Sequence, residues 1–315
     1  MKHYLAFDGG GTATRAGLYD AEGRLLHEAR GDASNPMALG LDTCISVLTD
    51  VGREALAGNA GRVDGIGAAI SGAWTSGMAS WLAGRLCEQF QAPRAVVAGD
   101  IRPILFANVG DAPGILAVAG TGSSVVAQAS GGLSAFIGGR GAFFGDDGSA
   151  FQIGQSALRA AARALDGLAP DTALTELLPE AAGVDSFHML VPWVRNASIR
   201  DIAGLAPAVA QAADYDAVAG ECIVAQAERM AEQVRAGFRK HDLPLDTPVL
   251  LNGGVFEHCP RYIEAFRIRL RALGVHTVPE LAPVRGHRAA LAMIRAENLP
   301  KTLLASEARM GAHGF

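Results

Sequence analysis

The stretch "AFDGGGTATRAGLYD", residues 6–20, places an acid and three glycines between two segments with the apolar pattern of β-strands. A turn of glycine and threonine leaves its backbone N–H groups unobstructed and pointing together, so it can bind an anion such as phosphate without a basic side chain. Asp8 cannot bind phosphate itself, but it can hold Mg²⁺, which bridges to phosphate oxygens. The stretch therefore indicates either a tight hairpin or one wall of a nucleoside triphosphate site that includes Asp8 and Thr12.

The residues around this turn follow the alternation expected of an α/β domain. Three consecutive strands begin the chain, and helices then alternate with strands, which indicates parallel additions to the sheet. The predicted strands are 3–8, 13–20, 23–30, 63–70 and 94–100, and the predicted helices are 39–57 and 76–90. We expect a first domain over residues 1–112.

The pattern of strand, glycine-rich turn and strand starts again at residues 114–139. A mostly helical region over 150–240 follows, with a loop-like, proline-containing part near 166–200. We expect the chain to end with an apolar strand at 248–255, a short strand near 275–279 and a last helix near 286–297 that can pack back on the first domain. The repeat predicts a duplicated architecture, with a second domain over 113–315 that faces the first across a cleft.

Two more glycine-rich segments follow apolar strands, "AGTGSS" at 119–124 and "LLNGGVFEH" at 250–258. The first is a second phosphate-type turn, and in the second Gly253 and Gly254 let a flat ligand lie against bare backbone. The chain contains neither the GxxxxGK[ST] loop nor the GxGxxG fingerprint, so ATP would be bound by a different arrangement.

Composition narrows the classes of partner. The 315 residues carry a formal net charge of −5, which gives no electrostatic reason to expect nucleic acid or an anionic membrane. The four cysteines form no CxxC pair, which argues against a zinc knuckle or a disulfide framework. Two uncharged stretches, 65–84 and 112–139, are interrupted by glycine, serine and threonine, so they indicate buried strands and short helices rather than membrane spans. With no signal peptide visible, we expect a cytoplasmic protein.

These motifs resemble those of the sugar kinase, Hsp70 and actin superfold and, within it, the N-acetylglucosamine kinase-like branch of the BadF/BadG/BcrA/BcrD ATPase family. The resemblance extends from residue 4 to about 293 and rests on "FDGGGTATR", "ASNP", "AGD", "AGTGSS" and "GGRGAFFGDDGSAFQIGQSAL". It implies two duplicated ribonuclease H-like domains of the actin-like ATPase fold, flanking a cleft that holds ATP, Mg²⁺ and a sugar.

The resemblance also assigns roles to residues. Asp8 would be the carboxylate on the Mg²⁺ side, and the glycine turns would hold ATP. The residues implied to bind the nucleotide are Asp8, Gly10, Gly11, Thr12, Thr121, Gly122, Gly253 and Gly254. The residues implied to bind the sugar are Asn35, Asp100, Ser123, Ser124, Gly139, Arg140, Gly141 and Asp146.

Three acids have alternative interpretations. Transfer to a sugar hydroxyl needs a carboxylate that accepts the proton, and Asp100 ends a strand where such a base is expected. Asp100 can instead be the N-cap of a helix that starts at Ile101. Asp146 and Asp147 can each cap the helix that begins near Ser149, with Asp147 the better cap and Asp146 the sugar ligand.

Two sugar-site positions depart from the pattern of the kinase branch, which commonly has Trp at Arg140 and Asn at Ser124. An arginine there disfavours the ammonium of free glucosamine and favours an N-acetyl carbonyl or a carboxylate-bearing sugar such as N-acetylmuramic acid. Alternatively, Arg140 points outward to a surface partner.

We therefore expect an ATP-dependent amino-sugar kinase that phosphorylates N-acetylglucosamine at the C6 hydroxyl, as a homodimer, with glucosamine or N-acetylmuramic acid as alternative substrates. A different class in the family, the ATPase activators of acyl-CoA dehydratases and reductases, holds an iron–sulfur cluster with cysteines, and none of the four lies beside the second phosphate turn. A sugar-sensing regulator would need a DNA-binding region before the first strand. A catalytically idle sugar-binding protein is the remaining alternative.

Overall fold

The computed structural model describes residues 2–56, 63–73, 75–132, 134–297, 299, 303 and 306–309. The chain divides into two compact units. Unit 1 comprises Met1–Ala112, Ser130–Leu133 and Ala282–Phe315, and unit 2 comprises Pro113–Ala129 and Ser134–Leu281. The first break between the units falls after Ala112, and the last part of the chain belongs to unit 1.

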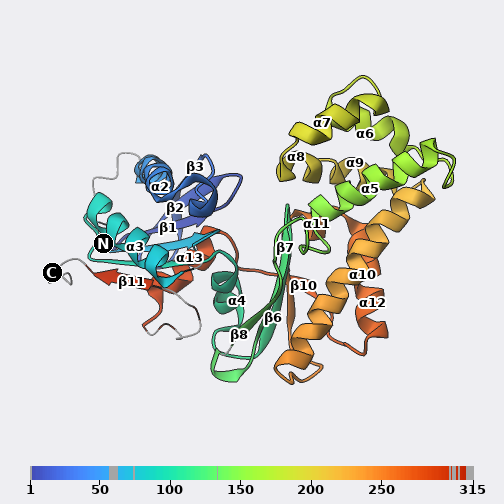
Figure 1. Ribbon diagram of the computed structural model, residues 1–315. Helices are drawn as coiled ribbons and strands as arrows, with labels where there is room; N and C mark the ends of the chain where they lie inside the picture. Colours follow the sequence, from blue (N-terminus) through green and yellow to red (C-terminus); the bar gives the residue numbers. More distant parts are fainter. Residues whose placement is uncertain are drawn as a thin grey trace. The chain divides into compact units, whose positions relative to one another are not determined.

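Unit 1 is built on a six-stranded sheet of order β11-β5-β4-β1-β2-β3 (Figure 1). The first three strands form an antiparallel meander, and β4 and β5 add in parallel to β1. The strands are β1 (Tyr4–Gly9), β2 (Thr14–Tyr19), β3 (Leu25–Gly31), β4 (Gly65–Ile70), β5 (Arg94–Ala98) and β11 (Ser306–Arg309). The first five confirm the strands predicted for this part of the chain to within two residues at each end.

Helices cover both faces of this sheet. They are α1 (Pro36–Leu39), α2 (Leu41–Leu56), α3 (Ser76–Phe90), α4 (Ile101–Val109) and α13 (His287–Arg295), with a 3-10 turn η1 (Ser130–Gly132). Because successive strand residues point to opposite faces, Phe7 packs with α2 and α3, and its neighbour Ala6 packs with α13. The expected helices at 39–57 and 76–90 are confirmed as α2 and α3, although residue 57 lies outside the described residues.

Unit 2 repeats the meander in a five-stranded sheet of order β10-β9-β6-β7-β8. Here β9 pairs in parallel with β6, as β4 does with β1, which confirms the duplicated α/β fold. The strands are β6 (Gly114–Ala119), β7 (Ser123–Gln128), β8 (Ser134–Gly138), β9 (Val249–Asn252) and β10 (Glu280–Leu281). The short strand expected near 275–279 was placed too early, since the pairing with β9 occurs at β10.

Most of the remaining chain of unit 2 is helical, and the loop expected near 166–200 is wrong over 174–182 and 190–196, which form helices. The helices are α5 (Ala150–Leu165), α6 (Leu174–Ala182), η2 (Phe187–Met189), α7 (Leu190–Asn196), α8 (Ile199–Ala203), α9 (Ala206–Ala212), α10 (Ala217–Lys240), α11 (Gly254–His258) and α12 (Pro260–Ala272). The prediction was wrong because proline was taken as a sign of a loop. Pro192 lies in the first turn of α7, where a backbone N–H would have no acceptor within the helix, and Pro179 lies inside α6. Of the helices in the described ranges, none combines the length and the apolar character needed to cross a bilayer.

Candidate functional site

In unit 1, two acids from separate sequence motifs meet at one edge of the sheet. β1, β4 and β5 are parallel neighbours, so their carboxyl ends lie together, with Asp8 at the end of β1 and Asp100 just after β5. The residue between them is Ser71, whose N–H donates to Gly9 O at 2.7 Å and whose hydroxyl donates to the Asp100 carboxylate. Sequence reasoning missed Ser71, and the only available signal was its place directly after a buried strand.

The carboxylate of Asp100 is not used as a helix cap. Asp100 occupies the N-cap position of α4, but its backbone is already helical, with φ −69° and ψ −23°, and its side chain makes no capping hydrogen bond. Burial and then the negative charge of Asp8 raise the pKa of Asp100 to about 6, against hydrogen bonds from its own backbone and from Ser71. Asp100 thus occupies the N-cap position without using its side chain as a cap, and its carboxyl group has a pKa close to neutrality.

Asp8 lies beside the start of α13. A Cβ atom on Gly286, the residue before that helix, would stand 3.4 Å from Asp8 Oδ2. Burial raises the pKa of Asp8, and the charges of His287 and Arg15 oppose this rise. Sequence reasoning missed both Gly286 and His287, because they follow Asp8 by almost the whole chain.

Asp8 has the donor type that Mg²⁺ requires. Mg²⁺ bound with a nucleotide takes oxygen ligands and needs only one or two carboxylates, because water and phosphates supply the others. Within the described ranges, no cluster of three or more His, Cys, Asp or Glu side chains is arranged for a metal. A cation at Asp8 would also relieve the repulsion between Asp8 and Asp100. The residues thus fit Mg²⁺ that arrives with ATP.

The glycine turn after β1 is fixed at its base and open at its tip. Gly10 N–H donates to Ala13 O at 3.0 Å, and Ser34 N–H donates to Gly10 O at 3.1 Å. Apart from its two chain neighbours, no described residue comes within 4 Å of a Cβ position on Gly11, and Thr12 is exposed. The turn therefore offers an accessible Gly11-Thr12 segment to a ligand.

The corresponding turn of unit 2 lies beside the third glycine segment. Gly253, with φ +109°, must be glycine, because a Cβ there would overlap the carbonyl of Ala119 at the end of β6. This contact brings Gly253 and Gly254 next to the turn that contains Thr121 and Gly122, at the carboxyl ends of the parallel strands β6 and β9. The four predicted nucleotide residues of unit 2 are thus close together.

Asp146 contacts one predicted sugar residue, Gly141, and one predicted nucleotide residue, Gly122. Its Oδ1 accepts a hydrogen bond from Gly141 N–H at 3.1 Å, and its Oδ2 stands 2.7 Å from where a Cβ of Gly122 would be. Burial raises the pKa of Asp146, the hydrogen bond from Gly141 opposes this, and the charge of Asp147 adds to it. Arg140, in the same loop, is exposed.

The two serines of this group differ in their hydrogen bonding. Ser123 Oγ donates to Asp147 O at 2.8 Å. Within the part of the chain that the structure describes, Ser124 Oγ is buried and has no hydrogen-bond partner, and a Cβ on Gly139 would stand 2.9 Å from it. A buried hydroxyl without a partner is unfavourable unless something binds to it, so Ser124 is a candidate ligand contact.

Asn35 lies in unit 1, apart from this group in the chain, and it caps a short helix. Its Oδ1 accepts from Met37 N–H at 2.9 Å at the start of α1 and packs against Gly72. Its amide nitrogen is the part of the side chain that capping leaves for a ligand.

The expected capping role of Asp147 is wrong. Ser149 caps α5, accepting from Gln152 N–H at 3.2 Å, because its extended backbone suits the N-cap position. The side chain of Asp147 instead pairs with Arg229 at 3.0 Å, where both side chains are about half exposed.

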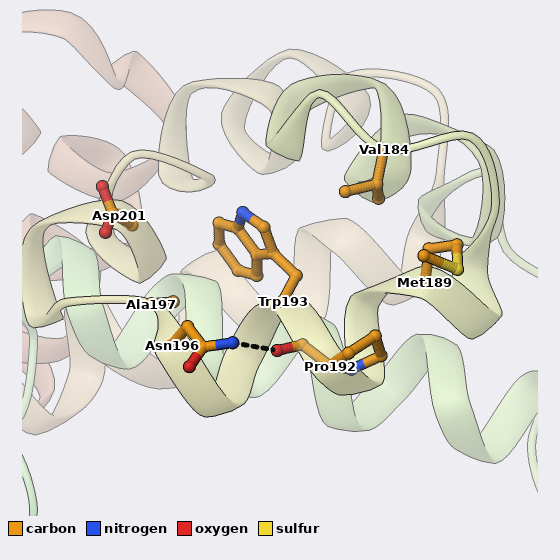
Figure 2. A pocket seen from close by; sticks show the side chains of 7 residues that line it. All are labelled: Val184, Met189, Pro192, Trp193, Asn196, Ala197 and Asp201. Carbon is orange, nitrogen blue, oxygen red and sulfur yellow. Dashed lines mark hydrogen bonds between the residues drawn. The ribbon is translucent and has the colours of Figure 1, made fainter.

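A cavity of about 370 Å³ lies elsewhere in unit 2, among the helices α6 to α8 (Figure 2). Its walls are mostly apolar, and its polar Asn196 donates from Nδ2 to Pro192 O at 3.1 Å. The lining residues are Val184, Met189, Pro192, Trp193, Asn196, Ala197 and Asp201. None of them belongs to the predicted site, so the volume of this cavity is no guide to the chemistry.

Comparison with known proteins agrees with this arrangement of acids and glycine turns. The sequence model of the BadF/BadG/BcrA/BcrD ATPase family matches residues 7–291. The chain belongs to this family. The match includes Asp8, Asp100 and all three glycine segments. A search of curated proteins finds no match.

Several solved structures that resemble the chain are described as sugar kinases. A candidate N-acetylglucosamine kinase from Chromobacterium violaceum is 27% identical, with a TM-score of 0.75, covering 93% of this chain and 99% of that one. One from Porphyromonas gingivalis is 22% identical, with a TM-score of 0.73 and coverages of 93% and 98%. A ROK family glucokinase from Streptomyces griseus, in complex with glucose and AMPPNP, is 16% identical, with a TM-score of 0.62 and coverages of 93% and 99%. The family member therefore has the actin-like ATPase fold of sugar kinases.

Proposed function

We propose that this member of the family is an ATP-dependent amino-sugar kinase that transfers the γ-phosphoryl group of ATP to the C6 hydroxyl of N-acetylglucosamine. The observation that carries the proposal is Asp100, a carboxylate with a pKa of about 6, free of capping duty and close to a second acid, Asp8. Phosphoryl transfer to an alcohol needs this combination, one group to accept the proton and one to hold Mg²⁺ at the phosphates. The sugar kinases among the structural neighbours support the same reaction.

The other residues have separate tasks in this proposal. The backbone amides and hydroxyls of the turns after β1 and β6 bind the phosphates of ATP, and the segment Gly253-Gly254 lies against adenosine. Asp8 binds Mg²⁺. Asn35, Asp100 and the group around Asp146 bind the sugar, and Arg140 favours an N-acetyl carbonyl over a free ammonium.

The substrate can be tested by coupled release of ADP from purified protein with N-acetylglucosamine, glucosamine, N-acetylmuramic acid and glucose. We expect the highest kcat/KM with N-acetylglucosamine. A preference for glucosamine would refute the proposal that Arg140 favours an N-acetyl carbonyl. Activity with N-acetylmuramic acid alone would show that this sugar, and not N-acetylglucosamine, is the substrate. Light scattering on the same sample tests the further proposal that the protein is a homodimer.

We expect kcat/KM for the sugar to rise with pH through about 6. Asp100 must be unprotonated to accept the proton, and because burial and Asp8 raise its pKa, the protonated form prevails below pH 6. Each further unit of acidity should then lower kcat/KM about tenfold. A profile measured from pH 5 to 9 that stays flat down to pH 5 would contradict the assignment of Asp100.

We expect Ser124→Ala to separate binding from stability. The hydroxyl of Ser124 is buried without a partner, so its removal should leave the unfolding free energy unchanged or raise it by up to about 1 kcal/mol. If the hydroxyl binds the sugar, KM for the sugar should rise about fivefold to tenfold, because one hydrogen bond is lost. Urea denaturation and initial-rate kinetics measure the two effects, and an unchanged KM would exclude Ser124 from the sugar site.

The alternative role as an activator of acyl-CoA dehydratases or reductases has less support. Such a protein needs thiolates to bind an iron–sulfur cluster. All four cysteines are buried, and burial raises the pKa of Cys44 to about 12 and that of Cys222 to about 11. The thiolate form is therefore disfavoured at both positions.

A further inference from the structure

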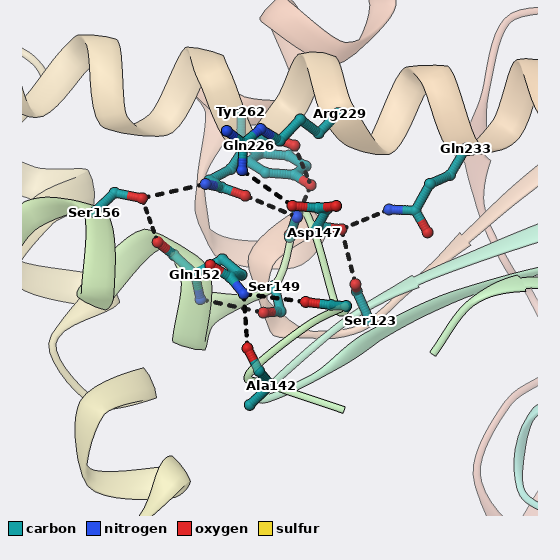
Figure 3. Close-up of polar contacts among 12 residues, drawn as sticks. Ser123, Ala142, Asp147, Ser149, Gln152, Ser156, Gln226, Arg229, Gln233 and Tyr262 are labelled. Atoms are coloured by element: carbon teal, nitrogen blue, oxygen red, sulfur yellow. Dashed lines mark hydrogen bonds and ion pairs between the residues drawn. The ribbon is translucent and has the colours of Figure 1, made fainter. Parts of the chain in front are cut away.

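The main chain that follows Asp146 is bound by helices far away in the sequence. Gly148 N–H donates to Gln226 Oε1 at 2.9 Å, and Tyr262 OH donates to Gly148 O at 2.8 Å (Figure 3). Gln233 Nε2 donates to Asp147 O at 2.7 Å. We call Gln226, Gln233 and Tyr262 the clamp, since they bind the main chain of two successive residues.

The clamp residues are held in place by two packed helices, and two of the three are buried. Gln226 and Gln233 are seven residues apart on α10, which places them on the same side of that helix. Tyr262 belongs to α12, which packs against α10. Gln226 is 2% exposed and Tyr262 is fully buried. A Cβ on Gly148 would stand 2.7 Å from Tyr262 OH, so the chain passes directly against the clamp.

The segment that the clamp binds includes one residue in an uncommon backbone conformation. Asp146 has φ +54°, in the left-handed region that residues other than glycine rarely adopt. Such a conformation persists only where surrounding contacts impose it. Ser149 N–H donates to Asp146 O at 3.1 Å, so the bound residues 147 and 148 are closed into one turn with Asp146.

One feature of the clamp does not serve stability. Gln233 Oε1 is buried and has no hydrogen-bond partner among the described residues, while the Nε2 atom of the same amide makes the bond to Asp147 O. A buried unpaired oxygen costs free energy that an apolar residue would avoid. The presence of glutamine at this position therefore favours a role for Gln233 Nε2 in positioning the main chain at Asp147.

We propose that the clamp positions the Asp146 carboxylate, so that Gln226, Gln233 and Tyr262 act on sugar binding without touching the sugar. The clamp imposes the left-handed turn, and the turn directs Asp146 Oδ1 to Gly141 N–H and Oδ2 toward Gly122. This inference rests on the proposed function in taking Asp146 as a ligand of the sugar.

The test is a double-mutant cycle of Gln233→Leu and Asp146→Asn in the full chain. Gln233→Leu removes the donor and the unpaired oxygen together, so its thermal stability should stay near that of the wild type. We expect it to raise KM for the sugar about tenfold, with KM for ATP within twofold. In the Asp146→Asn background the same substitution should have no further effect.

Arg229→Gln is the matched control. Arg229 lies between Gln226 and Gln233 on α10, and its guanidinium pairs with the half-exposed side chain of Asp147. The control should therefore leave both KM values unchanged. Tyr262→Phe should act in the same direction as Gln233→Leu, because it removes the bond to Gly148 O.

The results distinguish this inference from the proposed function. A tenfold effect of Gln233→Leu that persists in Asp146→Asn, or equal changes in both KM values, would overturn the clamp as a positioning device. If Asp146→Asn leaves the sugar KM unchanged, the proposed sugar site fails instead. Hydrogen exchange needs no activity: the clamp predicts about tenfold faster exchange of the Gly141 amide in Gln233→Leu, and an unchanged rate would refute it.

Discussion

Asp100→Asn should lower kcat by a factor of about 100 to 10,000, the usual range for loss of a general base. The asparagine keeps the size of the side chain and can still accept from Ser71, but it cannot take the proton of the sugar hydroxyl. Initial rates of ADP release with saturating sugar and ATP measure the effect. Full activity of the variant would eliminate Asp100 as the base.

The same variant should be no less stable than the wild type. Because the pKa of Asp100 in the folded protein is raised to about 6, its charged form is disfavoured there, and this cost is fully present above pH 6 and absent below about pH 4. Removing the charge should therefore raise the unfolding free energy at pH 8 by on the order of 1 kcal/mol, discounted for partial exposure, and leave it unchanged at pH 4. Loss of activity with lower stability at pH 8 would indicate damage to the fold instead.

Gly253→Ala should have the largest effect on stability, about 3 kcal/mol or more of unfolding free energy. A methyl group there would overlap the carbonyl of Ala119, which belongs to the backbone and cannot move aside, and φ +109° is strained for any residue with a Cβ. Thermal or urea unfolding measures the loss. An alanine variant of normal stability would show that the contact between this turn and β6 is looser than described.

Gly254→Ala is the matched comparison for this prediction. Its Cβ would meet no atom closer than His258 at 3.8 Å, and no left-handed φ is required, so stability should change little. If adenosine lies against the backbone here, the methyl group should raise KM for ATP and spare KM for the sugar. Equal effects on both substrates would argue against this placement of the nucleotide.

Strands of the first domain could be predicted well because β1, β4 and β5 are apolar and are each followed by glycine or serine. The glycine turns were visible as short local motifs. The helices near 166–200 were not predicted, because the prolines in this region were taken to indicate a loop. Leu174, Leu178 and Leu190 are nevertheless core residues. A local sequence pattern does not show which distant segments of the chain will pack against it.

The same limit applies to the candidate site. Asp8 and Asp100 could be named from motifs, but their proximity depends on β4 lying between β1 and β5. Ser71 and Gly286 carry no motif, and the partners of Gly148 come from α10 and α12. Capping was also misassigned at Asp147, because several polar residues near the start of α5 suited the role and only the backbone angles select Ser149.

A mass balance of phosphoryl transfer with N-acetylglucosamine, ATP and Mg²⁺ tests directly whether the protein is a kinase of this sugar. We expect one N-acetylglucosamine 6-phosphate, identified by phosphorus and proton NMR, for each ADP formed. With Asp100→Asn we expect the same product to form about 100 to 10,000 times more slowly. ADP formed at the same rate with and without any amino sugar, and no sugar phosphate, would contradict it.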